Sequence, residues 1–262
     1  MTAPRPSERC GTGRVAVVTG GGRGIGAAIS RRLAADGHTV VINYSKSVDD
    51  ARNLVEYIKK TGGRAEAIGG DVSDPAAVTS LFDEAGARFG PPTIVVNNAG
   101  VSAKASARQQ SVEQWDRLIA VNLSAAFYCT HAALGGMYEA DWGRVVFVGS
   151  PGGGRTIGAG MSAYSAAKAG LVAMGRCIAL ETAHRGVTVN TVVPGFVETD
   201  MTRSAGDTVL DGLRSRWPEV PADAVASTVS FLCSEEAAFV SGEDIAVWLG
   251  GPAPFARPSA MT

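Results

Sequence analysis

The chain has little that would direct it to nucleic acid, a membrane or a metal. Its 24 Lys and Arg residues nearly balance its 25 Asp and Glu residues, so the formal net charge is only -1. There is no basic run of the kind that binds nucleic acid or anionic lipid. No uninterrupted apolar stretch approaches the roughly 18 to 20 residues that span a bilayer. We therefore expect a soluble, cytoplasmic protein without nucleic-acid or membrane partners.

Cysteine and histidine are also scarce. The four cysteines are far apart, and the three histidines show no metal-ligand spacing. Neither a disulfide framework nor a metal site is predicted, and the thiols are interpreted as buried or incidental. Residues 1–13 are polar and lack the apolar core of a secretory signal. We predict flexible tails at 1–13 and 251–262 around a single domain at 14–250.

Short apolar runs rich in β-branched residues alternate with longer segments of helical character. Continuous apolar strands alternating with helices indicate a parallel sheet that is covered on both faces. We predict a three-layer α/β/α protein with a doubly wound parallel sheet, the Rossmann fold, in one domain. Gly37 is expected to close the first helix, Asp74 to cap the third, and Gly90 to end the third. The predicted strands are 15–19, 39–44, 65–68, 94–96, 145–148, 187–192 and 245–249.

A glycine-rich turn follows the first predicted strand and opens directly into a helix. Such a turn lets the backbone approach a pyrophosphate, and the helix N-terminus presents amide hydrogens and partial positive charge to it. The placement between a strand and a helix favours nucleotide binding over a plain tight turn. The expected cofactor-binding residues here are Gly20, Gly22, Arg23, Gly24, Ile25 and Gly26.

The end of the second predicted strand indicates which nicotinamide cofactor is bound. NAD-preferring enzymes usually have an acidic residue there, which accepts the ribose 2′-hydroxyl. This chain instead has Asn43, Tyr44, Ser45 and Lys46. Because Lys46 and Arg23 can attract a 2′-phosphate, NADPH is favoured over NADH. After the third strand, Asp71 and Val72 either bracket the adenine or shape the turn.

Residues suited to carbonyl chemistry come later in the chain. Asn98, Ala99 and Gly100 follow the fourth predicted strand, at the sheet edge where doubly wound proteins bind ligands. Ser150 follows the fifth strand. Tyr164 and Lys168 are four residues apart, which places them on one face of a helix.

This set suits the reduction of a ketone. The developing alkoxide needs a proton, and free tyrosine, with a pKa near 10, is a reluctant participant at neutral pH. We expect the ammonium of Lys168 to lower the pKa of Tyr164. Ser150 would hold the carbonyl oxygen, and Asn122 could anchor a water that links Lys168 to solvent. Each residue alone has an ordinary structural explanation, but the ordered set favours catalysis.

The ordered motifs resemble those of the short-chain dehydrogenase/reductase family: Thr-Gly-x-x-x-Gly-x-Gly, Asn-Asn-Ala-Gly, the strand-end serine and Tyr-x-x-x-Lys. Within it, the segment Pro194 to Thr202 is most similar to β-ketoacyl-acyl-carrier-protein reductases. The resemblance implies that Tyr164 is the general acid and that Lys168 also binds the nicotinamide ribose. It adds Pro194, Gly195, Val197 and Thr199 to the cofactor site. It also implies a homotetramer, or a dimer, and basic residues for an acidic carrier protein at Arg144 and Arg185.

The resemblance predicts an NADPH-dependent ketoreductase acting on a 3-oxoacyl thioester, with acyl carrier protein as a possible partner. The alternatives are an oxidoreductase for a free small-molecule ketone or alcohol, and a non-catalytic dinucleotide-binding protein. Three departures from the family pattern bear on this. Tyr164 follows Ser150 by one position more than usual, so the Gly152–Gly154 loop must bulge. The segment from Thr202 to Pro221 is short, and Trp248 replaces a small polar residue in the last strand.

Overall fold

The computed structural model describes residues 13–155, 158–204 and 206–248. Seven parallel strands form one sheet in the order β3-β2-β1-β4-β5-β6-β7. All seven predicted strands are confirmed, and most predicted ends are correct to within two residues. The expected tails lie outside the described residues, apart from Gly13. The strands are β1 Val15–Val18, β2 Thr39–Tyr44, β3 Arg64–Gly69, β4 Ile94–Asn97, β5 Gly143–Val148, β6 Val187–Pro194 and β7 Asp244–Val247.

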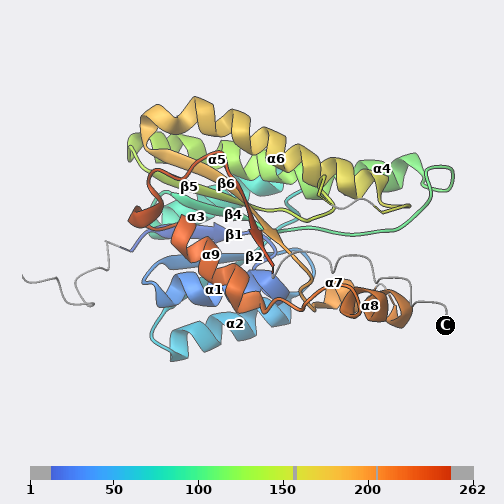
Figure 1. Cartoon of the computed structure of the whole chain (residues 1–262). Helices are drawn as coiled ribbons and strands as arrows, with labels where there is room; N and C mark the ends of the chain where they lie inside the picture. Colours follow the sequence, from blue (N-terminus) through green and yellow to red (C-terminus); the bar gives the residue numbers. More distant parts are fainter. Residues whose placement is uncertain (1–12, 156–157, 205, 249–262) are drawn as a thin grey trace, which may run out of the picture.

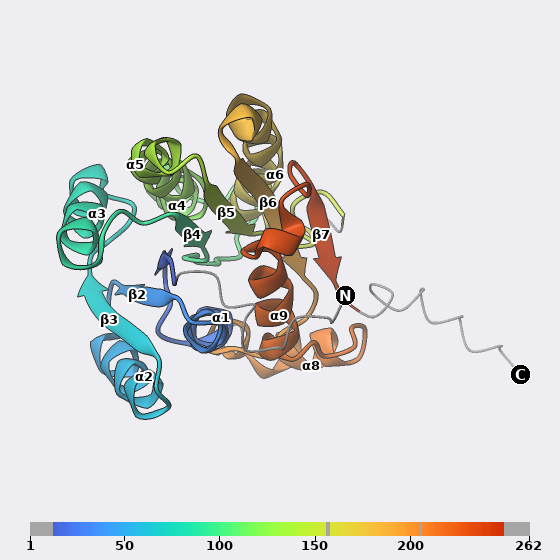
Figure 2. The same ribbon diagram turned by 90° about the vertical axis from the view of Figure 1, so that its left-hand side faces the viewer.

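Helices cover both faces of the sheet, as the sequence predicts (Figures 1 and 2). The helices α1 Gly24–Ala35, α2 Val48–Lys60 and α9 Ala222–Leu232 lie on one face, and the chain between β6 and α9 forms α7 Asp200–Arg203 and α8 Asp207–Arg214. The other face carries α3 Pro75–Phe89, α4 Val112–Ile119, α5 Ala125–Glu139 and α6 Ser162–Thr182. Each layer buries its own apolar cluster against the sheet.

Local sequence sets the helix boundaries. Asp74 accepts a hydrogen bond from the Ala76 amide, and Pro75 occupies the first helical position. Gly90 ends α3 with a φ of 88°, and Gly37 follows α1 with a φ of 95°. Both angles lie in the region that favours glycine. The expected boundaries at these three residues are confirmed.

One continuous helical stretch, Val112–Glu139, is long and apolar enough to cross a membrane by length and composition, since an 18-residue part of it has a mean hydropathy of 1.4. In this fold it comprises α4, a π-helical turn at Ala120–Ser124, and α5. It packs against α3, α6, β4 and β5. Its apolar residues therefore contribute to the layer that covers the sheet.

The two edges of the sheet differ in chemistry. Because every strand is parallel, all carboxyl ends lie along one edge, and the strand order reverses between β1 and β4 there. Arg144 is the second residue of β5, at the opposite, amino edge, and Arg185 precedes β6 at that same edge. The predicted cofactor and catalytic residues that follow strands therefore meet at one edge, away from these two arginines.

Arg144 does not fit the expected role of binding a carrier protein, because it is only 1% exposed. Its guanidinium donates hydrogen bonds to the carbonyls of Gly143, Gly186 and Ser234, and it stacks on Trp142 with its Cζ 4.2 Å from the ring centroid. A buried guanidinium with these partners ties strands and loops together. The prediction that Arg144 binds a carrier protein is wrong, because the tertiary structure buries its side chain. The residue types around Arg144 in the sequence do not indicate this burial.

Candidate active site

A cavity of about 650 Å³ opens at the carboxyl edge, and the glycine-rich turn after β1 forms one of its walls. The backbone here is packed too closely for side chains. A Cβ on Gly26 would overlap the Gly20 carbonyl oxygen and come within 2.6 Å of Asn98 Nδ2. No side chain caps α1, and its first turn contains no acidic residue. The free amides of the helix N-terminus and the glycine wall fit a dinucleotide pyrophosphate.

Thr19 and Asn98 join the two strands at the point where the strand order reverses. The Thr19 hydroxyl accepts hydrogen bonds from the amides of Asn98 and Ala99, both at 3.0 Å. The Asn98 side chain donates to the carbonyls of Thr19 and Gly20 at 2.9 and 3.0 Å. These bonds hold the glycine-rich turn against the end of β4. Asn98 lines the cavity, but its side-chain amide group is used to hold the glycine-rich turn in place.

The end of β2 forms the part of the wall expected to receive the 2′-phosphate. Ser45 and Lys46 are exposed and line the cavity, as does Arg23. Arg23 also lies 3.7 Å from Asp200 in a solvent-exposed ion pair, which is weak. Asn43 is 2% exposed and donates to the carbonyls of Ile68 and Gly70. It therefore shapes the wall through the β2–β3 connection.

Asp71 shapes its turn. Its carboxylate accepts hydrogen bonds from the amide and hydroxyl of Ser73 and lies 3.0 Å from Arg117 Nη2. Desolvation raises the pKa of Asp71, but the Ser73 and Arg117 contacts outweigh it, so the net pKa is lowered. Val72 and Arg117 line the cavity beside it. Sequence reasoning missed Arg117, because only the tertiary fold brings α4 to this turn.

Ser150 and Tyr164 meet despite the extra residue between them. The Ser150 hydroxyl lies close enough to Tyr164 to affect the pKa of its phenol, and a Cβ on Gly152 would lie 3.5 Å from Ser150 Oγ and 3.6 Å from Tyr164 Cε1. The loop forms a turn in which the Gly153 amide donates to the Ser150 carbonyl at 2.9 Å. A Cβ on Gly153 would come within 2.8 Å of the Lys168 backbone. Glycine thus lets the longer loop fold against α6.

Lys168 lies beneath the tyrosine and is 4% exposed. Its ammonium donates a 2.8 Å hydrogen bond to the Val148 carbonyl, and Nζ lies 5.9 Å from the centroid of the Tyr164 ring. Desolvation lowers the pKa of Lys168 to about 8. An amine with this pKa can gain or lose a proton near neutral pH.

The expected lowering of the Tyr164 pKa is not what the structure shows. Burial raises the pKa of Tyr164, and the hydrogen bond with Ser150 opposes this only in part. Lys168 is not among the groups that shift the pKa of Tyr164, and its ammonium donates to the Val148 carbonyl. The prediction that Lys168 lowers this pKa is wrong for the protein alone. A raised pKa keeps Tyr164 protonated, which is the state that a proton donor needs.

Asn122 lies in the π-helical turn between α4 and α5. Its side-chain amide donates to the carbonyls of Val101 and Leu118, both at 2.9 Å, and its Oδ1 accepts from the Val101 amide. A Cβ on Gly100 would lie 2.9 Å from this Oδ1 and 3.7 Å from Lys168 Nζ. The π turn therefore places Asn122 next to Lys168, with both amide hydrogens already bound.

Not every predicted residue reaches the cavity. Ser150, Pro194, Gly195 and Val197 are absent from its wall, whereas Thr199 lines it and contacts the region of Gly24. Gly195 lies under Trp248, because a Cβ there would be 2.8 Å from the Trp248 Cβ. The wall also includes residues that the sequence did not indicate, among them Val101, Ser102, Ala103, Gln114, Arg117, Leu118, Val121 and Met201.

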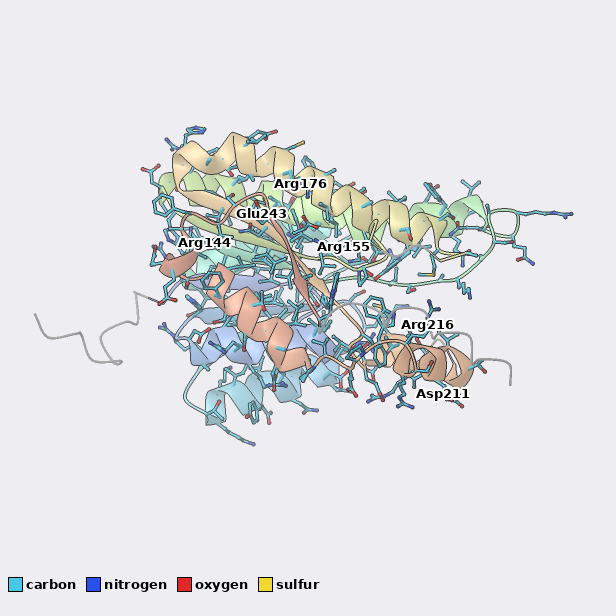
Figure 3. All side chains as sticks on the ribbon, viewed as in Figure 1. Arg144, Arg155, Arg176, Asp211, Arg216 and Glu243 are labelled. Atoms are coloured by element: carbon cyan, nitrogen blue, oxygen red, sulfur yellow. The ribbon has the colours of Figure 1, made fainter. Side chains whose placement is uncertain are left out.

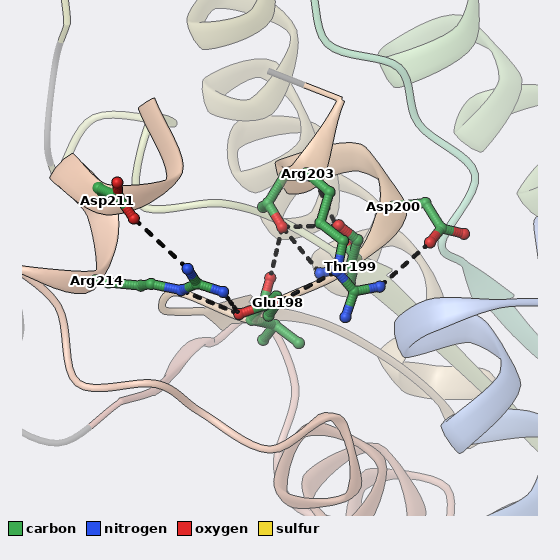
Figure 4. Close-up of polar contacts among 8 residues, drawn as sticks. Glu198, Thr199, Asp200, Arg203, Asp211 and Arg214 are labelled. Atoms are coloured by element: carbon green, nitrogen blue, oxygen red, sulfur yellow. Dashed lines mark hydrogen bonds and ion pairs between the residues drawn. The ribbon is translucent and has the colours of Figure 1, made fainter. Parts of the chain in front are cut away.

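Ion pairs hold the segment that borders the cavity after β6. Glu198 binds Arg203 Nε at 3.1 Å and Arg214 Nη2 at 2.8 Å, which links it to α7 and α8 (Figure 4). Hydrogen bonds from Arg214 and Arg203 lower the pKa of Glu198. Thr199 caps α7 in a reciprocal pair of hydrogen bonds with Thr202. This network fixes where Thr199 meets the cavity.

The fold and this site define a dinucleotide-binding oxidoreductase whose cavity is lined by a tyrosine and a lysine, with a serine behind the tyrosine. Residues 14–209 match the family described as short chain dehydrogenase. The chain belongs to this family.

Curated relatives support the same family. The chain is 38% identical over 239 residues to the 3-oxoacyl-[acyl-carrier-protein] reductase FabG of Salmonella typhimurium, covering 90% of this chain and 96% of that protein. It is 38% identical over 241 residues to the corresponding reductase MabA of Mycobacterium tuberculosis, covering 89% and 91%.

Solved structures agree. A short chain dehydrogenase from Burkholderia cenocepacia in complex with NADP is 39% identical, with a TM-score of 0.85 over 92% of this chain and 98% of that one. A short-chain dehydrogenase/reductase from Serratia marcescens is 33% identical, with the same TM-score over 90% and 96%.

Proposed function

We propose that the protein is an NADPH-dependent ketoreductase that reduces a 3-oxoacyl thioester to the secondary alcohol. The observation that carries this is the position of Tyr164 and the buried Lys168 in a glycine-walled cavity, with Ser150 next to Tyr164. The FabG and MabA relatives are named as 3-oxoacyl-acyl-carrier-protein reductases. The Burkholderia structure contains NADP.

NADPH, when bound, supplies the hydride for the carbonyl carbon. Gly20 to Gly26 and the N-terminus of α1 hold its pyrophosphate. Lys46 and Arg23 attract its 2′-phosphate, since no acidic residue stands between Asn43 and Lys46. Thr199 lines the cavity beside Gly24, and Lys168 lines it beside Tyr164.

The protein's side chains bind the carbonyl oxygen and supply its proton. Ser150 and Tyr164 both donate to the substrate carbonyl oxygen, which places this oxygen where negative charge develops. Tyr164 then transfers its hydroxyl proton to that oxygen, because the developing alkoxide is a stronger base than the tyrosinate. Lys168, with a pKa of about 8, can return a proton after Tyr164 has given up its own. Asn122 fixes the polypeptide next to Lys168.

We also propose that acyl carrier protein is a partner. Of the two arginines predicted to bind it, only Arg185 remains a candidate. Arg185 Nη2 donates to the Tyr138 carbonyl and Nε lies 3.6 Å from Asp141, with its side chain 40% exposed. We also propose a homotetramer, or a dimer, in the cytoplasm. A free small-molecule ketone is the competing substrate class, since the segment 202–221 that borders the site is shorter than we expect for carrier-protein reductases.

The test follows NADPH oxidation at 340 nm with a short 3-oxoacyl thioester, the same acyl group on acyl carrier protein, and a panel of free cyclic ketones. We expect turnover of both thioesters. The variant Arg185→Glu should weaken use of the carrier-bound substrate roughly tenfold and leave the free thioester unchanged. Turnover restricted to free ketones would assign the protein to small-molecule metabolism instead.

A further inference from the structure

The loop that carries Ser150 has no stiffness of its own. Three successive glycines, Gly152 to Gly154, follow Pro151, and Gly154 has a φ of 114°. Glycine leaves more backbone freedom to be lost on ordering than any other residue. Within the loop only short-range bonds occur among the described residues, such as Gly152 N to Ser150 Oγ at 3.2 Å. Something outside the loop must therefore fix Ser150.

Arg155 provides a contact to the rest of the protein. Its Nη2 donates to Asp244 Oδ2 at 2.6 Å and to the Asp244 backbone carbonyl at 3.1 Å. Asp244 is the first residue of β7, and its side chain is 19% exposed. The Arg155 guanidinium also lies over Trp248, with Cζ 5.4 Å from the ring centroid. One side chain thus joins the loop to both ends of the last strand.

Asp244 also connects the Arg155 side chain to the helix that carries Tyr164 and Lys168. Arg176 Nη2 from α6 lies 2.7 Å from the other carboxylate oxygen of Asp244. Tyr164 and Lys168 are on this same helix. Figure 3 shows Arg155 and Arg176 extending from their separate elements. The carboxylate therefore holds the serine loop and the tyrosine helix at one point, and the two arginines together hold its pKa low.

Trp248 connects the Arg155 side chain to the segment 202–221. Its ring packs edge-on against Trp217, with centroids 6.0 Å apart and planes at 79°. Trp217 belongs to the 202–221 segment. The longer serine loop and the unusual tryptophan just after β7, which look like separate departures in the sequence, are in contact through Arg155.

We propose that Arg155 is a positioning residue, which holds the Ser150 hydroxyl on Tyr164 by anchoring the glycine loop to Asp244 and Trp248. This proposal rests on the proposed reductase function for its kinetic consequence. Arg155 does not line the cavity. It acts on the reaction only through Ser150, and its loss should have no effect where Ser150 is already absent.

The test compares Arg155→Ala with the matched control Arg176→Ala, which removes the other arginine on the same carboxylate. Hydrogen exchange of peptides containing Gly152 to Arg155 should be at least tenfold faster in Arg155→Ala and unchanged in Arg176→Ala. Because the Arg155 side chain is 43% exposed, this variant should fold. Arg155→Lys, which retains charge without the planar fork, should give intermediate exchange. Unchanged exchange in Arg155→Ala would overturn the proposal.

The kinetic arm is a double-mutant cycle with Ser150→Ala. Arg155→Ala should lower kcat roughly tenfold or more in the wild-type background and less than twofold in the Ser150→Ala background. NADPH affinity should change less than twofold. Equal losses in both backgrounds contradict a role through Ser150. If the wild type reduces no carbonyl compound, the reductase function fails, and the exchange measurement still decides whether Arg155 fixes the loop.

Discussion

Lys168 donates a 2.8 Å hydrogen bond from its buried ammonium to the carbonyl of Val148, two residues before Ser150. This bond connects α6 to the end of β5, so the helix that carries the tyrosine is fixed against the strand that carries the serine. It leaves the ammonium 5.9 Å from the centroid of the Tyr164 ring. Burial has the largest effect on the pKa of both groups: it raises the pKa of Tyr164 and lowers the pKa of Lys168.

Removing the tyrosine hydroxyl should abolish turnover. In Tyr164→Phe the substrate oxygen loses its proton donor, and we expect kcat to fall roughly a thousandfold or more. NADPH affinity, measured by fluorescence titration, should change less than about threefold, because the pyrophosphate contacts are distant. Retained turnover would refute the role of Tyr164.

The cofactor preference should depend on Lys46. In Lys46→Ala the loss of one charge-assisted contact to the 2′-phosphate should raise the Kd for NADPH roughly tenfold or more. The Kd for NADH should stay the same, because NADH has no such phosphate. An equal loss for both cofactors would mean that Lys46 does not bind the 2′-phosphate.

The glycine wall should tolerate no side chain. Gly26→Ala places a Cβ against the Gly20 carbonyl oxygen and the Asn98 amide, so we expect a loss of roughly 1–3 kcal/mol in stability and weaker NADPH binding. Gly86→Ala in α3 is the control, since its Cβ meets no atom within 4 Å. It should stabilise the helix by roughly 0.5–1 kcal/mol. Thermal melts and cofactor titration compare the two.

Lys168 should make stability depend on pH. Its folded pKa of about 8 lies below its ordinary value of 10.5, so the unfolded chain holds the proton more tightly between these values. The charged form destabilises the fold below pH 8, and this cost disappears as the pH rises toward 10.5. Relative to Lys168→Met, the wild type should gain about 2 kcal/mol between pH 7 and 9.5. Denaturant titrations at both pH values measure this, and a flat difference contradicts it.

Arg144 should matter for stability and not for catalysis. Arg144→Ala leaves three backbone carbonyls and the Trp142 face without their guanidinium, at a cost of roughly 2–4 kcal/mol. Urea titration should show this loss. Activity per folded molecule with carrier-bound substrate should be unchanged, and a selective loss there would restore the carrier role.

The sequence by itself determined the fold and the chemistry of the site. Apolar strands such as 39–44, alternating with capped helices, have few ways to bury their surface other than a doubly wound sheet. Tyr164 and Lys168 share a helix face by spacing alone. Glycines after β1 mark a turn where side chains do not fit. These are local properties, which a short stretch of chain expresses wherever it is placed.

The tertiary structure decided what depends on distant neighbours. Burial made Arg144 a core residue, set the direction of both pKa shifts, and brought Arg117 to the cavity. It also joined Arg155 to Asp244, 89 residues away in the sequence. Desolvation and long-range pairing depend on which segments pack together, and residue type and spacing along the chain do not encode that directly.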